Sequence, residues 1–327
     1  MKNIELKQIN HYYGKEKVLH DISLSIKEGE FFTLLGPSGC GKTTILRILG
    51  GFIRPSSGAI YVSNQDIINL PPEKRNMGTV FQNYALFPNM TVEENIAYGL
   101  KIKKLPQNII KDKCETYLNL AGLIEYRNKR IDELSGGQQQ RIAIARALAI
   151  EPTMLLLDEP MSNLDVALRV KMREEIREIQ QKIGITTLFI THDQQEALAI
   201  SDKIAVMKDG RVLQVGTPMD IYNNPANDFV ANFVGTSNLI DKSEYDHFGI
   251  KSEDKEIYVR PEQMILVENI KNEGFVKVKI NSKKFLGSTI EYTVSYKDKK
   301  YNVVELNRLN NKLSVGSTAY LGLMQGE

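Results

Sequence analysis

The sequence has few of the features that would set it apart from ordinary globular proteins. It contains no tryptophan and only two cysteines, Cys40 and Cys114, so a reducing cytosol is expected and a disulfide framework is not. No stretch approaches the ~18 uninterrupted apolar residues of a membrane-spanning helix, and residues 1–6 lack the apolar core of a signal peptide. A formal net charge of +2 is too small to indicate nucleic-acid binding. No group of His and Cys has metal-ligand spacing.

The length and composition of the sequence are typical of a soluble globular protein. With 327 residues, two domains are favoured over one. Hydrophobic residues make up 42% and charged residues 25%, the usual balance for such proteins. The composition changes near Gly235, which predicts domains at residues 1–235 and 236–327.

The most specific stretch is a glycine-rich loop of the G-x-x-x-x-G-K-[ST] type, which begins at Gly36 and ends at Thr43. The apolar run at residues 31–35 predicts a buried parallel strand before it, and residues 43–49 predict a helix after it. The predicted phosphate-binding residues are Gly36, Pro37, Ser38, Gly39, Cys40, Gly41, Lys42, Thr43 and Thr44.

Each residue type in this loop has a chemical reason. Glycine lets the backbone curl so that successive N–H groups point at phosphate oxygens, and the helix start adds partial positive charge. Lys42 is expected to reach the β and γ phosphates of a nucleotide, and the Thr43 hydroxyl to bind Mg²⁺. The alternative is a glycine-rich strand–helix turn without a ligand.

A second predicted anion site lies at Leu134–Gln138. Ser135 is a helix cap, and Gly136 and Gly137 expose backbone N–H groups at the helix start. No lysine follows, so this site is expected to complete a phosphate site that is held elsewhere. An ordinary capped helix is the alternative reading.

Two carboxylates end a predicted buried strand at residues 154–158. The carboxyl ends of parallel strands line the ligand crevice of such sheets. Asp158 is therefore placed to hold Mg²⁺ through water, and Glu159 to orient or deprotonate an attacking water. Two surface acids at a strand end are the alternative.

Three further residues are predicted near the same crevice. Gln82 follows a strand at residues 77–81 and has the chemistry to touch Mg²⁺ and a water, although most glutamines are solvated. His192 follows a strand at residues 185–190 and could hydrogen-bond a γ phosphate. Tyr13 is a candidate to stack on a nucleotide base, with a core position as the alternative.

The other patterns complete the predicted fold. Residues 84–150 turn helical, which indicates a helical insertion into an α/β domain, and Asp209-Gly210 predicts a hairpin. From residue 236 onward only short strands are expected, forming a small barrel-like all-β domain.

In order along the chain, these motifs resemble those of ABC-type ATPases over residues 3 to about 235. The Ser-Gly-Gly-Gln sequence before an acidic strand is very specific to that family. The matching motifs are the Walker A loop at 36–43, the Q-loop at Gln82, the signature at 134–138, the Walker B strand at 154–159, the D-loop at 162–165 and the H-loop at His192. Tyr13 falls where the family places its base-stacking aromatic.

The tail resembles the β domain that follows importer ATPases, because it contains Tyr258-Val259-Arg260-Pro261-Glu262 and Phe285-Leu286-Gly287-Ser288. The resemblance implies a RecA-like core with an antiparallel β subdomain and a helical insertion, followed by an OB-like (TOBE-like) domain. Importers of this type take up maltose, iron(III), polyamines, sulfate or 2-aminoethylphosphonate. The short tail favours iron(III), 2-aminoethylphosphonate or a polyamine over a sugar.

The resemblance also implies a mechanism and partners. Two copies would face each other head to tail, and Ser135-Gly136-Gly137 of one copy would complete the ATP and Mg²⁺ site of the other. Two integral membrane permease subunits would bind near residues 84–88, and an extracytoplasmic solute-binding protein would act indirectly. The subunit would be peripheral, at the cytoplasmic face of the membrane.

Two rival functions follow from the same motifs. A soluble ABC ATPase acting on nucleic acid or ribosomes usually carries two cassettes or a long coiled coil, and neither is evident here. A P-loop kinase would use Lys42 to transfer phosphate to a metabolite. We expect the importer subunit, with no nucleic-acid partner.

Overall fold

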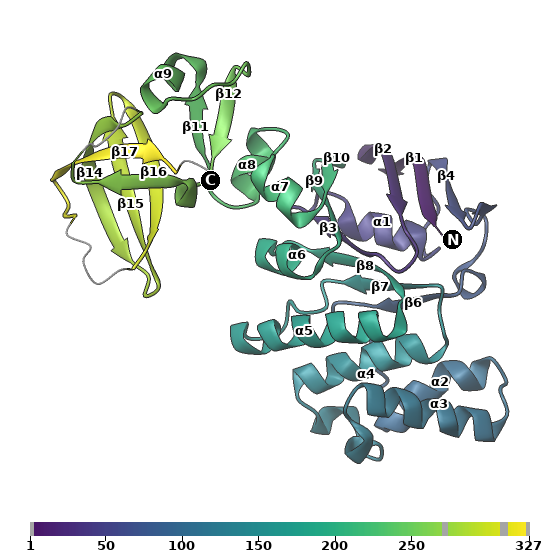
Figure 1. The fold of residues 1–327 in the computed structure, drawn as a ribbon. Coiled ribbons are helices and arrows are strands. Elements are labelled where there is room, and N and C mark those ends of the chain that lie inside the picture. Colours follow the sequence, from purple (N-terminus) through teal and green to yellow (C-terminus); the bar gives the residue numbers. More distant parts are fainter. Residues whose placement is uncertain (1–2, 270–273, 308–312, 325–327) are drawn as a thin grey trace. The chain divides into compact units, whose positions relative to one another are not determined.

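The chain forms two compact units, Met1–Ile221 and Tyr222–Glu327. The computed structural model describes residues 3–269, 274–307 and 313–324 (Figure 1). The division falls before the composition change near Gly235 that marks the predicted boundary.

A six-stranded sheet forms the centre of the first unit, in the order β10-β9-β3-β8-β7-β6. All of these strands run parallel except β10, which pairs antiparallel with β9 in the hairpin predicted at Asp209-Gly210. Every residue of β3, β7 and β8 is buried, as their apolar composition predicts. The strands are β3 Phe31–Leu35, β6 Met77–Val80, β7 Met154–Asp158, β8 Thr186–Thr191, β9 Lys203–Lys208 and β10 Arg211–Gly216.

Alternate residues of these strands face two different cores. Phe32 and Leu34 pack with α1 (Lys42–Leu49) and with a second, antiparallel sheet, in the order β2-β1-β4-β5. Phe31, in contrast, packs with α4 (Gly136–Ala149) and α5 (Val166–Ile183). Because side chains alternate across a strand, α1 and the α4–α5 pair cover opposite faces of the sheet. The second sheet consists of β1 Ile4–Tyr13, β2 Glu16–Ile26, β4 Ser57–Val62 and β5 Gln65–Asp66.

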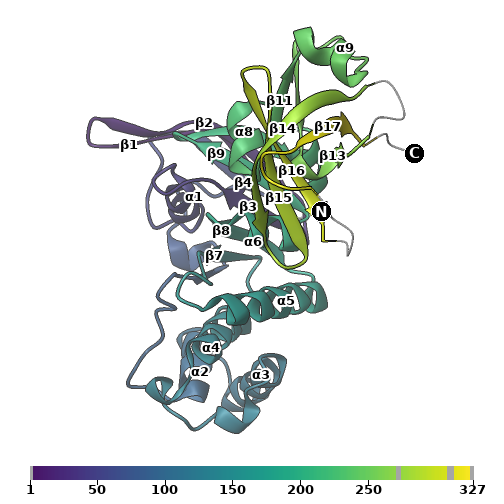
Figure 2. The ribbon, with the colours of Figure 1, turned by 90° about the vertical axis from the view of Figure 1, so that its left-hand side faces the viewer.

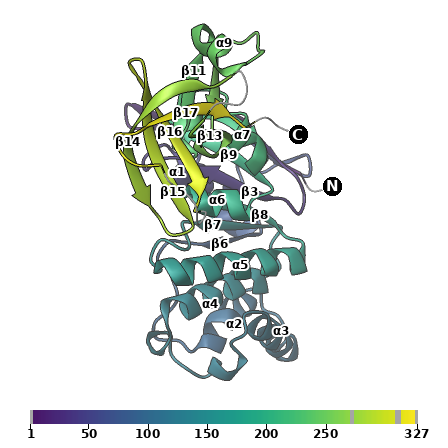
Figure 3. The ribbon, with the colours of Figure 1, turned by 60° about the vertical axis from the view of Figure 1, so that its left-hand side comes forward.

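A helical segment lies beyond the α4–α5 face. Figures 2 and 3 show α2 (Val92–Ile102) and α3 (Gln107–Leu120) packed with α4, on the far side of α4 and α5 from the strands. Thr91 and Glu94 form a capping box at the start of α2. Helix α6 (Gln194–Ile200) follows β8 in the same unit. Together these elements confirm the predicted α/β fold class.

The second unit is a small β domain, as predicted. Its main sheet is antiparallel in the order β13-β17-β14-β15-β16, and the edge strands β13 and β16 contact each other, so the sheet is nearly closed. A separate pair joins β11 and β12. The strands are β11 Asn238–Asp241, β12 Glu256–Val259, β13 Met264–Val267, β14 Val276–Phe285, β15 Thr289–Tyr296, β16 Lys299–Leu306 and β17 Thr318–Leu323.

The prediction of short strands only from residue 236 onward was wrong in one respect. A single helical turn, α9 (Tyr245–Phe248), follows β11 and ends at Gly249, whose φ is +66°. Four residues are too few to show a helical period in a sequence. The Lys299 ammonium pairs with Asp241 and Glu244 just before this turn, a contact between segments far apart in the chain.

Buried Arg260 contacts Tyr222, the residue with which the second unit begins. Its guanidinium donates to the Tyr222 carbonyl at 2.6 and 2.8 Å, to Ala231 O at 2.7 Å and to Thr236 O at 3.1 Å. These carbonyls lie at or near the ends of α7 (Pro218–Asn223) and α8 (Asp228–Phe233). A cation held by carbonyls at helix ends ties the helices to the β domain.

We predict that Arg260→Met destabilises the protein by about 3 kcal/mol, because several hydrogen bonds to a buried cation are lost together. Thermal or urea unfolding of the full chain measures this. Lys251→Met is the control, since it removes an exposed positive charge from the same unit. Equal stability of the two variants would contradict the role given to Arg260.

Candidate nucleotide site

The predicted site residues meet at one edge of the six-stranded sheet. Leu35 at the end of β3 is in register with Thr191 at the end of β8, and Asp158 at the end of β7 is in register with Ile190. Three loops therefore leave the sheet at the same level. They begin with Gly36, Glu159 and His192, as expected for a ligand crevice at the carboxyl ends of parallel strands.

The loop at residues 36–44 has the backbone that its glycines predict. Gly39 and Gly41 have φ values of +81° and +101°, which side-chain-bearing residues rarely adopt. A Cβ at Gly36 would lie 2.5 Å from the Met207 carbonyl, so only glycine fits there. Ser38 and Gly39 are exposed, whereas Cys40 is buried and its carbonyl accepts from Gly210 N.

Lys42 lies inside this loop with only 4% of its surface exposed. Its ammonium donates to the carbonyls of Gly36 at 2.7 Å and Pro37 at 2.9 Å. These acceptors are neutral, so the lysine keeps its positive charge available for an anion at the loop. A buried cation with neutral partners fits a site for phosphate.

Thr43 and Asp158 bring two oxygen ligands together. The Thr43 hydroxyl donates to Asp158 Oδ1 at 3.0 Å. Burial raises the pKa of Asp158, and the hydrogen bond from Thr43 opposes that shift. A hydroxyl and a carboxylate beside a phosphate loop fit Mg²⁺, which takes few ligands from protein and the rest from phosphates and water.

Glu159 and His192 face each other across neighbouring loops. His192 Nδ1 lies 3.2 Å from Glu159 Oε2, and the Glu159 backbone N–H donates to Ile190 O at 3.1 Å. Glu159 has a positive φ of +45°, an uncommon conformation for a residue with a side chain. A carboxylate beside an imidazole at this edge can hold a water and accept its proton.

Gln82 and Tyr13 are both exposed, and among the described residues neither side chain forms a hydrogen bond with this pair. Gln82 is exposed, and its carbonyl accepts from Asn163 Nδ2 at 3.1 Å, which joins it to the loop after Glu159. Tyr13 is 46% exposed and lies edge-on to His11 with ring centroids 4.7 Å apart. The exposure excludes a core position for Tyr13, and base stacking stays a prediction.

Residues 135–138 lie on the other face of the sheet from α1. Ser135 caps α4 in a capping box with Gln138, whose N–H donates to Ser135 Oγ at 3.4 Å. Gly136 and Gly137 lie against Leu164 and Leu168, at the start of α5. Figures 1 and 2 show α4 well apart from α1. Ser135 and Gly136 are exposed, so this anion site is open to another molecule.

Comparison with known proteins identifies the family of this chain. A family model described as "ABC transporter" matches residues 19–162. An Fe(3+) ions import ATP-binding protein of Fusobacterium nucleatum is 44% identical, with 99% of this chain and 91% of that protein aligned. A spermidine/putrescine import ATP-binding protein of Clostridium novyi is 47% identical over 92% of this chain and 90% of that protein. The chain belongs to the importer branch of the ABC-transporter ATP-binding proteins.

A solved structure of an ATP-binding cassette is also similar to this chain. This cassette, described as a dimer in a post-hydrolysis state with ADP and Pi, is 33% identical with a TM-score of 0.58; the match covers 66% of this chain and 98% of that one. The predicted ATPase activity coupled to import is thereby confirmed for this importer ATP-binding subunit. The alternative of a soluble ATPase acting on nucleic acid or ribosomes finds no support among these relatives.

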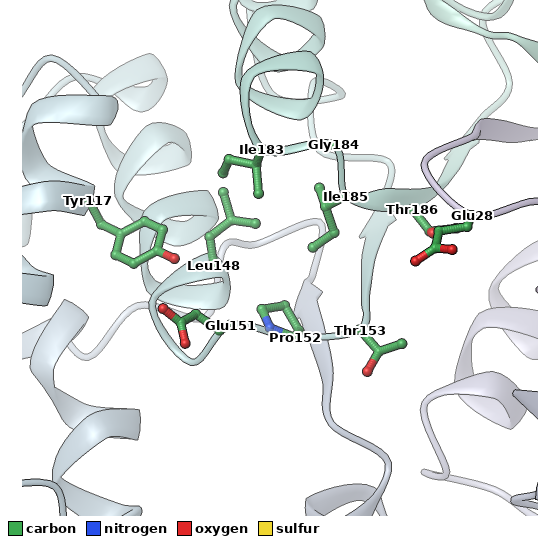
Figure 4. Close-up of a pocket in the computed structure, with 10 residues that line it drawn as sticks. All are labelled: Glu28, Tyr117, Leu148, Glu151, Pro152, Thr153, Ile183, Gly184, Ile185 and Thr186. Carbon is green, nitrogen blue, oxygen red and sulfur yellow. The ribbon is translucent and has the colours of Figure 1, made fainter. Parts of the chain in front are cut away.

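A pocket of about 210 Å³ lies elsewhere in the importer subunit (Figure 4). It opens at the amino ends of β7 and β8, beside Tyr117, Glu151 and Thr186, which is the sheet edge opposite Glu159. None of the predicted site residues lines it. The predicted charged groups and the phosphate loop meet instead at the carboxyl edge of the sheet, where ligands bind in such folds.

Arg169 contacts two of these loops, although the sequence did not predict it as a site residue. Arg169, in the first turn of α5, contacts the carbonyl of Leu164 and the carboxylate of Asp193. In the sequence it is one of several charged residues in an amphipathic helix, so no local pattern distinguishes it.

The two glycines of the phosphate loop offer a matched test. Alanine at Gly39 has the strained φ but free space around Cβ, whereas alanine at Gly41 adds a 2.6 Å contact with buried Leu19. We predict that Gly41→Ala weakens ATP binding more than Gly39→Ala, by about 1–3 kcal/mol for the additional strain. Titration with a fluorescent ATP analogue measures both, and equal affinities would contradict the prediction.

Proposed function

We propose that two copies of this subunit bind and hydrolyse ATP between them and so drive uptake of ferric iron or a polyamine. The Glu159–His192 contact next to Lys42, Thr43 and Asp158 is the observation that supports this most directly. The solutes are those for which the similar import proteins are named. Both are small cations, and both relatives align over nearly their whole length.

The phosphate loop would hold the nucleotide. Backbone N–H groups of residues 36–44 and the Lys42 ammonium would bind the β and γ phosphates, and Tyr13 would stack on the base. Thr43 and Asp158 would hold Mg²⁺, with Gln82 completing the set when its loop approaches. When bound, Mg²⁺ neutralises phosphate charge and so favours attack at the γ phosphorus.

Glu159 would act on the attacking water. Its carboxylate, at the crevice edge, accepts a proton from that water, while His192 holds the carboxylate in place and contacts the γ phosphate. The proposed base and its orienting partner directly follow β7 and β8, two neighbouring strands of one sheet. The geometry of the pair then depends on strand register and loop conformation.

The second copy would supply the missing wall of the site. Ser135 and Gly136 are exposed and Gly137 is buried behind them; their N–H groups lie at the start of α4, on the opposite face of the sheet from α1. A head-to-tail pair would bring this group of one copy to the phosphate loop of the other. This is consistent with the dimeric state described for the related ADP-bound cassette.

The membrane partners follow from the same proposal. Two permease subunits would bind beside residues 84–88, where exposed Phe52 packs on Phe81 and Tyr98 on Phe87. An extracytoplasmic solute-binding protein would deliver the solute to them. Among the described residues, no helix combines the length and the apolar character needed to cross a bilayer. The subunit would be peripheral, at the cytoplasmic face.

Glu159→Gln is predicted to lower the hydrolysis rate by about 10²–10⁴-fold, because the amide cannot accept the proton of the attacking water. ATP affinity should be unchanged, and a closed dimer should accumulate with ATP. Phosphate release and size-exclusion chromatography with ATP measure these effects. Glu151→Gln, at the opposite sheet edge, is the control, and hydrolysis by Glu159→Gln at the control rate would contradict the assignment.

Ser135→Arg is predicted to leave ATP binding intact and stop hydrolysis, because a bulky cation would block the contact with the other copy's nucleotide. Thr116→Arg, exposed on α3, is the matched control and should hydrolyse normally. Mixing Ser135→Arg with Lys42→Ala should restore part of the activity, since a mixed pair has one site without either change. Unchanged turnover in Ser135→Arg alone would contradict the shared site.

A further inference from the structure

Arg169 contacts both loops of the Glu159–His192 pair: the loop that follows Glu159 and the turn that contains His192. One guanidinium nitrogen donates to Leu164 O at 3.2 Å, within the loop at residues 162–165. A second lies 3.3 Å from Asp193 Oδ2, and the Nε lies 3.6 Å from Glu196 Oε1. A single planar cation therefore contacts the loop that follows Glu159 and the turn that carries His192.

The carboxylates that bind Arg169 also hold the turn around His192. Asp193 accepts from the N–H groups of Gln195 at 2.8 Å and Glu196 at 3.2 Å, which caps α6. Thr191 donates to Glu196 Oε2 at 2.5 Å and accepts from Asp193 N at 2.9 Å. Of the two neighbours of His192, Thr191 is therefore hydrogen-bonded to Glu196, and Asp193 itself contacts Arg169.

Arg169 also binds the loop at residues 162–165, which is hydrogen-bonded to Glu159 and Gln82. Ser162 donates from its hydroxyl to the Glu159 carbonyl at 3.0 Å, and Asn163 donates to the Gln82 carbonyl. Leu164, next in the chain, is the residue whose carbonyl binds Arg169. Movement at Leu164 would therefore reach both Glu159 and Gln82.

Charge and burial make this contact specific to a guanidinium. Glu196 is only 5% exposed, so its carboxylate needs a nearby cation, and burial raises its pKa while Arg169 opposes that shift. Lysine carries the charge but lacks the planar fork that reaches three acceptors in different directions. Arg173, one turn further along α5, donates to Gln195 O instead.

We propose that Arg169 is a positioning residue for hydrolysis, which holds the His192 turn against the loop after Glu159 and so fixes the distance between imidazole and carboxylate. The inference rests on the proposed roles of Glu159 and His192. It assigns Arg169 no contact with ATP, so its loss should affect turnover and leave nucleotide affinity unchanged.

The test uses the full-length protein and compares Arg169→Met with Arg177→Met. Arg177 lies on the same helix, with its nearest Asp202 contact at 2.5 Å and similar exposure, but contacts neither loop. We expect kcat to fall at least tenfold in Arg169→Met while the Kd for an ATP analogue changes less than twofold. Arg177→Met should keep kcat within twofold even if its melting temperature falls. Arg169→Lys should restore part of the lost kcat.

Each other outcome counts against the proposal. A wild-type kcat in Arg169→Met, a parallel loss of kcat and ATP affinity, or an equal loss of kcat in Arg177→Met would overturn it. If Arg169→Met does not fold, Arg169→Lys and Glu196→Gln replace it, with the same separation of kcat from affinity required. Normal turnover in Glu159→Gln would instead refute the proposed function, so the two failures are distinguishable.

Discussion

The register of three parallel strands is the constraint on which the nucleotide site depends. β3, β7 and β8 are in register, so Gly36, Glu159 and His192 leave the sheet at one edge. Their side chains are buried on both faces, which leaves no freedom to slip along the sheet without exposing apolar surface. A phosphate loop, a carboxylate pair and an imidazole from distant parts of the sequence therefore meet at fixed positions.

The two proposed ATP-binding groups, the phosphate loop and Ser135-Gly136, lie on opposite faces of that sheet. α1 packs on one face and α4 on the other, so the phosphate loop and the exposed Ser135-Gly136 group are held apart by the sheet itself. Neither helix can cross the sheet without unfolding the core. Completing the site with a second copy is the simple solution to this geometry.

Three arginines, of which Arg75 and Arg260 are buried, hold chain segments through backbone carbonyls. Arg75 donates to the carbonyls of Ile48 and Leu49 at the end of α1. Arg146 donates to Tyr84 and Ala85, two residues with positive φ beside the proposed permease surface, and Arg260 binds the ends of α7 and α8. Carbonyls at helix C-termini lack intrahelical donors and carry partial negative charge, and a guanidinium can bind several carbonyls at once.

The sequence by itself determined the elements and the chemistry at their ends, because loops, caps and strand ends depend on residues close together in the chain. The phosphate loop, the capping boxes at Thr91 and Ser135 and the hairpin at Asp209-Gly210 are of this kind. Only the tertiary structure decided which distant groups meet: Thr43 with Asp158, Glu159 with His192, and Arg169 with both loops. It also brought Arg260 into contact with the carbonyls of Tyr222 and Ala231, which precede the strands of the β domain. Such contacts join segments that no local pattern relates, so they arise only when the sheet has set their positions.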